Sequence, residues 1–329
     1  MINTMFETDR LILRPWEDTD ADCLFEYASD PQVGPAAGWP AHQSVSESLE
    51  VILNVLKKPE SYAVCLKSDG KAIGSIGLKL KGDTDMTERD DECELGYWIG
   101  RPFWGQGLIP EAASEMLRHA FEDLGMGKVW CGYYEGNTKS KRVQEKLGLR
   151  YQWTTDEVEV PLMQEIRKGH VNAITRDQWI RDRIRRVDEN KKQYLDLLLL
   201  ADEQESMIDR YLEQGALYVL EDRGIPKAEC VITDEGNGIA EIKSLAVSPA
   251  FQRKGYGRAM IAFAADCCKE KYTMLQVGTG DSPLTIPFYE SCGFIRHHVI
   301  PDFFTDNYDH PIFEGGVQLK DMVCLRMPL

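Results

Sequence analysis

Two glycine pairs are the residues whose type and spacing most directly suggest chemistry. The first pair is Gly105 and Gly107, and the second is Gly255 and Gly257. Each pair follows an apolar segment typical of a strand and precedes an amphipathic segment typical of a helix. A strand, a glycine turn and a helix start expose unpaired backbone N–H groups at the positive end of a helix dipole. This arrangement predicts phosphate binding, because glycine lets the backbone approach the anion closely.

Three classes of phosphate-binding loop have glycines at a similar spacing and are compared with the two pairs. A dinucleotide-binding turn needs a third glycine or alanine three positions on, where Pro110 and Met260 stand. A nucleoside-triphosphate loop needs Gly-Lys-Ser/Thr, which neither site has. The third class is the pyrophosphate loop of acyl-coenzyme A enzymes, which reads Gln or Arg, two residues, then Gly-x-Gly or Gly-x-Ala. The second loop matches it in full with Gln252, Arg253, Lys254, Gly255, Tyr256 and Gly257.

The first loop fits the same class less completely. It keeps Gly105, Gln106 and Gly107 but has Pro102 where Gln or Arg is usual. The alternative for either loop is an ordinary strand-to-helix turn. The strand before, the helix after and the repetition favour cofactor binding at both.

The elements around the loops occur twice in the same order. The two glycine pairs are 150 positions apart, about the length of a domain. Each half reads as a strand, a glycine loop, a helix, a strand, a short helix and a strand. The expected helices begin near Pro110 and Met260, the strands after them span 129–134 and 273–277, and hairpins precede the loops at 62–66 with 72–80 and at 217–221 with 228–233. The charged segment 167–186 is predicted to be helical and to contain the junction, which gives domains 1–182 and 183–329.

Composition restricts the class of protein. The chain has 329 residues, 43% hydrophobic content and a net charge of −16. These values indicate folded domains, and the negative charge argues against nucleic-acid binding. The amino terminus has no signal-peptide core, and no apolar run could span a membrane. We expect no membrane partner.

The cysteines and histidines indicate a reducing compartment and no metal. The nine cysteines form no CxxC pair, as expected for reduced thiols in a cytoplasmic protein. The six histidines do not cluster with ligand spacing. Only His297 and His298 are adjacent, and in a strand they would point to opposite faces.

Both halves resemble Gcn5-related N-acetyltransferases. The first is similar to the RimJ/RimL type, which includes ribosomal-protein-alanine and aminoglycoside-modifying enzymes. It carries the motif residues of 8–14, 97–98, 103–107, 111–112, Asn137 with Ser140, and 146–148. The second resembles small bacterial acetyltransferases through 197–202, 278–280, 288–294, 302–304 and 311–315. The resemblance covers nearly the whole chain and implies an α/β (α+β) fold. Each of the two tandem domains would be a mixed, mostly antiparallel twisted sheet flanked by helices.

The resemblance also implies how acetyl-coenzyme A would bind. The glycine-loop amides would hold the pyrophosphate, and Arg253, Lys254 and Arg258 would offset the negative charge of the chain. The strand before each loop would pair with the pantetheine arm, which places Ile99 in the first half and Leu245 and Val247 in the second. Asn137 would contact pantetheine, with a helix cap as the alternative.

Four further residues receive chemical roles from the same resemblance. Tyr289 would protonate the departing sulfur, and Glu241 and Glu94 would act as general bases in their respective halves. Ser140 would contact the sulfur. The alternatives are a core aromatic for Tyr289, solvated strand residues for the glutamates and a first-turn hydroxyl for Ser140.

The sequence therefore predicts an acetyl-coenzyme A-dependent N-acetyltransferase. The acceptor would be a primary amine on a small molecule or a peptide. One alternative is that only one domain is catalytic, favouring the carboxyl-terminal one, while the other shapes the substrate cleft. Another is a non-catalytic sensor of acyl-coenzyme A. The acceptor and the oligomeric state stay open at this stage.

Overall fold

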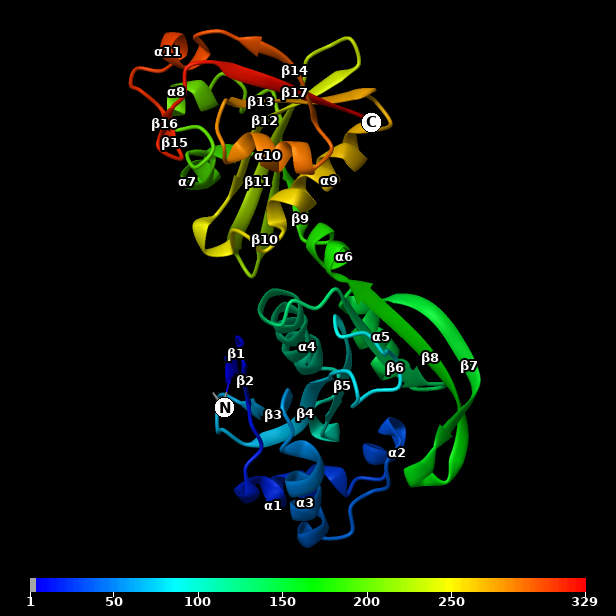
Figure 1. The fold of residues 1–329 in the computed structure, drawn as a ribbon. Coiled ribbons are helices and arrows are strands. Elements are labelled where there is room, and N and C mark those ends of the chain that lie inside the picture. Colours follow the sequence, from blue (N-terminus) through cyan, green and yellow to red (C-terminus); the bar gives the residue numbers. More distant parts are fainter. Residues whose placement is uncertain (1–3) are drawn as a thin grey trace. The chain divides into compact units, whose positions relative to one another are not determined.

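The computed structural model describes residues 4–329, which form two compact units (Figure 1). The first unit ends at Arg176 and the second begins at Asp177, whereas the sequence placed the junction between 182 and 183. Trp179 accounts for the earlier position. Its buried ring lies 4.2 Å from the guanidinium of Arg183 and 5.7 Å from the ammonium of Lys227, so it packs into the second unit.

The first unit is built on one eight-stranded sheet with the order β1-β2-β3-β4-β5-β6-β8-β7. Its strands are β1 (Phe6–Glu7), β2 (Leu11–Arg14), β3 (Ser61–Leu66), β4 (Ala72–Lys79), β5 (Glu92–Ile99), β6 (Lys128–Tyr134), β7 (Arg150–Val160) and β8 (Glu165–Thr175). All neighbouring strands pair antiparallel except β5 and β6. The hairpin and the strand expected around 62–80 and 129–134 are confirmed.

Helices pack on this sheet and provide its core. They are α1 (Ala21–Ala28), α2 (Gly34–Ala37), α3 (Val45–Val51), α4 (Leu108–Arg118) and α5 (Thr138–Lys146). The apolar stripe expected on α4 is buried, and it continues into a π-helical turn, His119–Asp123. A second group of buried side chains, including Trp16, Leu24 and Ile52, packs α1 and α3 on the sheet.

The second unit repeats the plan with a seven-stranded sheet in the order β14-β17-β13-β12-β11-β10-β9. Its strands are β9 (Ile184–Val187), β10 (Ala216–Asp222), β11 (Ile225–Asp234), β12 (Ile239–Val247), β13 (Met274–Gly280), β14 (Ile295–Ile300) and β17 (Met322–Pro328). The parallel neighbours here are β12 and β13. A separate small hairpin joins β15 (Phe313–Glu314) to β16 (Val317–Gln318).

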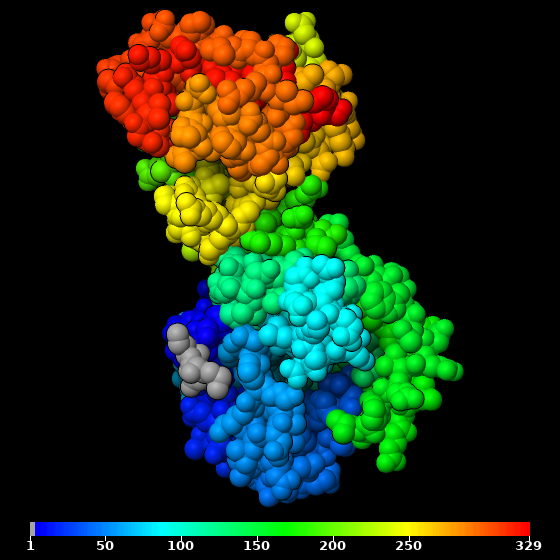
Figure 2. All heavy atoms as spheres, viewed as in Figure 1, coloured from blue at the N-terminus to red at the C-terminus, as the bar shows by residue number. Residues whose placement is uncertain are grey.

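The helices of the second unit are α6 (Arg176–Arg181), α7 (Leu195–Leu198), α8 (Glu205–Ile208), α9 (Tyr256–Cys268), α10 (Thr285–Ser291) and α11 (Phe303–Asn307). Buried residues of α7, α8 and the sheet, including Leu198, Ile208 and Val219, form a core separate from that of the first unit. The elements from α10 onward, coloured orange to red, form much of the visible face of this unit in Figure 2.

The helix predicted over 167–186 is wrong for most of its length. Only Arg176–Arg181 is helical, and Glu165–Thr175 is a strand that pairs with β6 on one side and β7 on the other. Hydrogen bonds to two neighbouring strands override the local preference of a charged segment.

The prediction that His297 and His298 point to opposite faces is also wrong. The register of β14 against β17 shifts between Arg296 and His298, and the two Nδ1 atoms lie 2.8 Å apart. An extra residue in a strand breaks the alternation of side chains. Within residues 4–329, no group of three or more His, Cys, Asp or Glu is placed to hold a metal ion, and all nine cysteines are free. No helix in this range is long and apolar enough to cross a bilayer.

Candidate functional site

In each unit the parallel strands separate along their length. In the first, β5 and β6 pair only from Glu92 to Glu94, although β5 continues to Ile99. In the second, β12 and β13 pair only from Ile239 to Ile242, although β12 continues to Val247. The last part of β5 and of β12 thus has no strand partner on this side. Free backbone groups along a strand edge can bind an extended, amide-containing ligand.

The residues predicted to pair with such a ligand lie on these free segments. Leu245 and Val247 are in the unpaired end of β12, and Ile99 ends β5. The backbone carbonyls of Val247 and Ile99 already accept a hydrogen bond from a side chain. The side chain of Gln252 donates to the Val247 carbonyl at 3.1 Å, and the indole of Trp104 donates to the Ile99 carbonyl at 2.9 Å.

The glycine loop of the second unit follows the free end of β12 after one short 3-10 turn, Pro249–Phe251. Gly255 is the N-cap of α9 and has a φ of +84°, a conformation that favours glycine. Arg253 also has a positive φ, and its side chain is exposed. The loop thus presents the amino end of a 13-residue helix beside an exposed cation. This geometry suits a phosphate.

Three loop residues predicted to bind cofactor have structural partners. The ring of Tyr256 is buried and makes an edge contact with Phe251. Arg258 donates to the Ser291 carbonyl at 2.8 Å, which joins α9 to α10. A Cβ on Gly257 would meet the Phe288 ring at 3.0 Å, so this glycine permits the close packing of α9 and α10.

The first-unit loop has the same design with different contacts. Gly105 and Gly107 both have a φ of +76°, and Gly107 is the N-cap of α4. The Gln106 side chain donates to the Pro102 carbonyl at 2.9 Å. The ammonium of Lys139 lies 4.1 Å from the centre of the Trp104 ring, which places a cation beside the loop.

A set of hydrogen bonds to which sequence reasoning assigned no role holds this loop through Thr8, Arg10, Gln106 and Glu111. The Glu111 carboxylate, in the first turn of α4, accepts hydrogen bonds from the Thr8 hydroxyl at 2.5 Å and the Arg10 amide at 2.8 Å. The Arg10 guanidinium donates to Glu111 at 2.7 Å and to the Gln106 carbonyl at 3.0 Å. These partners are about 100 positions apart in the sequence, so no local spacing could have linked them.

The two predicted general bases are both held by a lysine. Glu94 accepts from Lys79 at 2.8 Å and from the Thr84 hydroxyl at 2.6 Å, through different oxygens. Glu241 accepts from Lys243 at 2.9 Å and from the Gln276 amide at 2.7 Å, again through different oxygens. Each carboxylate is buried and lies where the parallel strands are still paired. Each of the four oxygens thus accepts one hydrogen bond and keeps a further lone pair.

Tyr289 is buried in α10 between Phe288 and Phe294, with ring centroids at 5.2 and 5.7 Å. Burial raises the pKa of its phenol well above the usual value. Among residues 4–329 its hydroxyl makes no hydrogen bond that would compete with a ligand. A buried, neutral phenol can donate a proton to a developing anion.

The first unit places a different tyrosine near its predicted sulfur contact. The Tyr97 hydroxyl, from the free segment of β5, lies 3.0 Å from the Ser140 hydroxyl on α5. The Gln144 side chain donates to the Ser140 hydroxyl at 3.2 Å, and the Asn172 side chain donates to Gln144 at 2.8 Å. Tyr97 is among the motif residues of the first half but received no role from the sequence, because it belongs to a strand and not to the helix that carries Tyr289 in the second unit.

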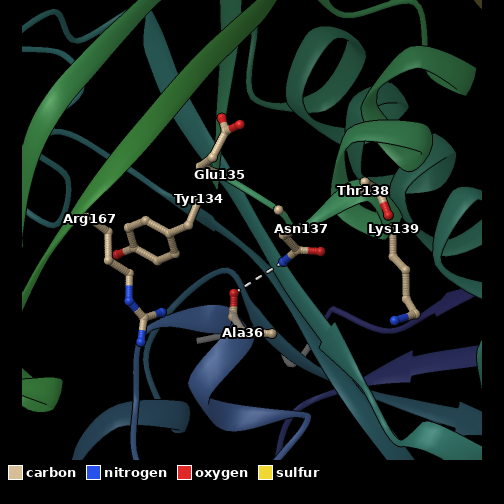
Figure 3. A pocket seen from close by; sticks show the side chains of 8 residues that line it. Ala36, Tyr134, Glu135, Asn137, Thr138, Lys139 and Arg167 are labelled. Carbon is tan, nitrogen blue, oxygen red and sulfur yellow. Dashed lines mark hydrogen bonds between the residues drawn. The ribbon is translucent and has the colours of Figure 1, made fainter.

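Asn137 joins α5 to α2 at the edge of a hollow of about 260 Å³ (Figure 3). Its side chain accepts from the Ser140 amide at 3.1 Å, as a helix cap does, and donates to the Ala36 carbonyl at 3.1 Å. Arg167 and Lys139 also line the hollow, so it is bordered by two cations.

Comparison with known proteins gives one family in both halves. Residues 10–150 and residues 213–296 each match a family model described as an acetyltransferase (GNAT) domain. The uncharacterized N-acetyltransferase YvbK of Bacillus subtilis is 34% identical over 149 residues, which is 45% of this chain and 96% of that protein. The FsC-acetyl coenzyme A-N(2)-transacetylase of Aspergillus fumigatus is 37% identical over 182 residues, which is 53% of this chain and 77% of that protein.

Solved structures of the same family are also similar. The crystal structure of a GNAT family acetyltransferase from Elizabethkingia anophelis with acetyl-CoA bound is 34% identical. It covers 44% of this chain and 97% of its own, with a TM-score of 0.43.

Proposed function

The chain belongs to the Gcn5-related N-acetyltransferase family, with two acetyltransferase domains, and we propose that each unit binds one acetyl-coenzyme A. One observation carries the proposal: in both units the parallel strand pair separates just before a glycine turn that starts a helix. The free strand edge suits the pantetheine amides, and the helix start suits the pyrophosphate. The name of the Aspergillus relative supports acetyl-coenzyme A as donor.

We further propose that the second unit transfers the acetyl group to a primary amine of a small molecule or peptide. An alkylamine with a pKa of ~10.4 is mostly protonated at neutral pH, which costs roughly 4–5 kcal/mol before the nitrogen can attack. The neutral nitrogen attacks the thioester carbonyl carbon, the C–S bond breaks, and the thiolate takes a proton from the phenol of Tyr289. Its hydroxyl makes no hydrogen bond to the described residues, which supports this unit as the catalytic one.

The amine must also lose a proton. The resemblance assigns this step to Glu241 here and to Glu94 in the first unit. Their contacts with Lys243 and Lys79 are consistent with a structural role, because both oxygens of each carboxylate are already engaged.

Calorimetric titration of the full chain with acetyl-coenzyme A tests the binding proposal. Two molecules should bind per chain. Gly255→Val and Gly105→Val should each weaken one site at least ~10-fold, because a side chain in a phosphate turn blocks the approach of the anion. Gly224→Val and Gly70→Val are matched controls, since both glycines have a positive φ and open surroundings away from the loops. Absence of binding heat would refute the proposal.

A thiol-release assay over a panel of amines tests the transfer. Free coenzyme A should appear together with acetylated amine for at least one class of primary amine. Binding of acetyl-coenzyme A without turnover for any amine would favour the sensor alternative instead.

A further inference from the structure

The second unit contains a buried carboxyl group that the function proposed above does not use. Glu229 is in the middle of β11 and has no solvent exposure. Its Oε1 accepts from the Ser244 hydroxyl at 2.6 Å. Its Oε2 is buried and has no hydrogen-bond partner in the described part of the chain. A buried carboxyl oxygen without a partner is costly, so a functional reason for it is expected.

Ser244 connects this carboxyl group to the free segment of β12. The strand β12 stays paired with β11 here, and Glu229 lies opposite Ala246. On its other side, the parallel pairing with β13 ends at Ile242. Ser244 therefore lies on the segment where the pantetheine arm is proposed to bind. Adjacent strands are about 4.8 Å apart, so the carboxyl group is one strand away from that edge.

Further hydroxyl and carboxyl groups continue the Glu229–Ser244 hydrogen bond toward the surface. Burial raises the pKa of Tyr211, and a hydrogen bond that its phenol oxygen accepts from the Ser244 hydroxyl opposes that effect. The same phenol donates to Asp202 at 3.4 Å, and the half-buried Tyr308 donates to the other Asp202 oxygen at 3.0 Å. The five residues Glu229, Ser244, Tyr211, Asp202 and Tyr308 form a continuous chain of groups that can exchange protons.

Hydrogen bonds from the Ser244 hydroxyl and the Ala246 amide favour the charged form of Glu229, but burial outweighs them. The titratable groups that interact with it are the thiol of Cys230 on the same strand, the phenol of Tyr211 after α8 and the phenol of Tyr289 in α10. Burial raises the pKa of each, so all three are neutral near pH 7. Burial also raises the pKa of Glu229 to about 8. A carboxyl group with a pKa near the working pH is well suited to accept and release a proton.

We propose that Glu229 is the proton acceptor for the acceptor amine in the second unit, acting through the hydroxyl of Ser244. This inference rests on the proposed function of that unit. The ammonium gives a proton to the Ser244 oxygen as the Ser244 proton moves to Glu229. The neutral nitrogen then attacks the thioester, the C–S bond breaks and Tyr289 protonates the sulfur. One of the two protons left on the nitrogen goes to solvent, from which the Tyr289 phenolate is reprotonated, and the other stays on the amide. Glu229 then returns its proton to Ser244, from which it passes outward through Tyr211 and Asp202.

The pH profile of kcat/KM for an alkylamine, measured on the full chain, tests the proposal. In the unaltered protein the rising limb should have its midpoint near 8, because the ionised form of Glu229 is the active one. Glu229→Gln keeps the shape of the side chain but cannot take a proton. Its limb should move to the amine's own pKa of ~10, with kcat/KM at pH 7 lower by at least ~10²-fold.

Two further variants separate this role from a structural one. Ser244→Ala keeps the carboxyl group and removes the bridge, so it should shift the limb in the same direction even if Glu229→Gln does not fold. Glu221→Gln removes a carboxylate from the neighbouring strand β10 and should leave the limb near 8. Affinity for acetyl-coenzyme A should be nearly unchanged in all three, since each substitution alters only a side chain, whereas the pantetheine arm is proposed to pair with the backbone of β12.

The competing assignment gives the opposite pattern. If Glu241→Gln moves the limb while Glu229→Gln and Ser244→Ala leave it in place, the proton acceptor is Glu241 and our inference is overturned. Infrared titration of the carboxyl band supplies a readout that does not need turnover. A protonated band that disappears with a midpoint near 8 and is missing in Glu229→Gln supports the proposal, and its absence contradicts it. Failure of the proposed function itself would appear differently, as no acetylated amine from the unaltered chain.

Discussion

Tyr289 and Ser140 are the residues expected to act at the sulfur in their respective units, but they have different surroundings. Tyr289 is packed between two aromatic rings, and its hydroxyl has no hydrogen bond to the described residues. The Ser140 hydroxyl is already in contact with Tyr97 and Gln144. A proton donor that must be ready for a departing thiolate benefits from having no competing partner. This contrast supports assigning the chemistry to the second unit.

The role proposed for Tyr289 predicts a loss of rate without a loss of affinity. Tyr289→Phe keeps the ring packing and removes only the hydroxyl. We expect kcat for thiol release to fall by about 10²-fold, the usual contribution of a general acid. The Kd of acetyl-coenzyme A from calorimetry should stay the same.

Tyr218→Phe is the matched control for this experiment. Tyr218 is on β10, and its ring makes an edge contact with Phe263 at 5.1 Å. The kcat of Tyr218→Phe for thiol release should equal that of the unaltered chain. An equal loss in both variants, or no loss in Tyr289→Phe, would contradict the assignment of the acid.

At the scale of elements, the end of the α4 segment is held by a buried histidine. His119 begins the π-helical turn, and its ring contacts Glu60 through Nε2 at 2.8 Å and Asp123 through Nδ1 at 2.9 Å. Burial alone would lower the pKa of His119, but the hydrogen bonds to these carboxylates outweigh it and raise the pKa above the usual value. The ring thus joins the end of α4 to Glu60, the residue before β3.

This contact predicts a pH-dependent stability. A raised pKa in the folded state means that the stabilisation is complete below the unfolded pKa of ~6.5. It is lost as the pH rises through the higher folded value. His119→Gln should therefore lower the free energy of unfolding more at pH 6 than at pH 9, as measured by urea unfolding. A destabilisation that is equal at both pH values would show that the ring acts by packing alone.

At the scale of the whole molecule, the chain consists of two units with separate cores. Each core has a distinct polar anchor. In the first unit, Glu111 binds Thr8 and Arg10. In the second, the buried ammonium of Lys191 donates to the carbonyls of Leu212, Glu213 and Gly215 at 2.7–2.9 Å. Units with separate cores are expected to unfold independently.

Differential scanning calorimetry checks this independence. Two transitions are expected, and Glu111→Ala and Lys191→Met should each lower only one of them. Loss of a charged hydrogen-bond set costs roughly 1.5–3 kcal/mol. The effect should be smaller for Glu111, because Arg10 is half exposed and water screens its charge. Each kcal/mol corresponds to about 2–4 °C. If each variant lowers the temperature of both transitions, the two units unfold together.

The amino-acid sequence by itself determined the features that depend on neighbouring residues. Glycine spacing identified the two loops, periodicity identified α4 and α9, and alternation identified the hairpins before each loop. The order of elements repeated 150 positions apart, which predicted a tandem fold. These signals are local, because a helix start, a turn or a strand pattern is set by a few consecutive side chains.

Only the tertiary structure decided which polar groups meet and which stay apart. The segment 165–175 is a strand because β6 and β7 offer hydrogen bonds, although its charges favour a helix. Lys79 and Lys243 engage the predicted bases, and Arg10 reaches Glu111 across about 100 positions. The buried state of Glu229 depends on the packing of helices over its sheet. Such contacts join residues far apart in the chain, and burial is a property of the packed whole.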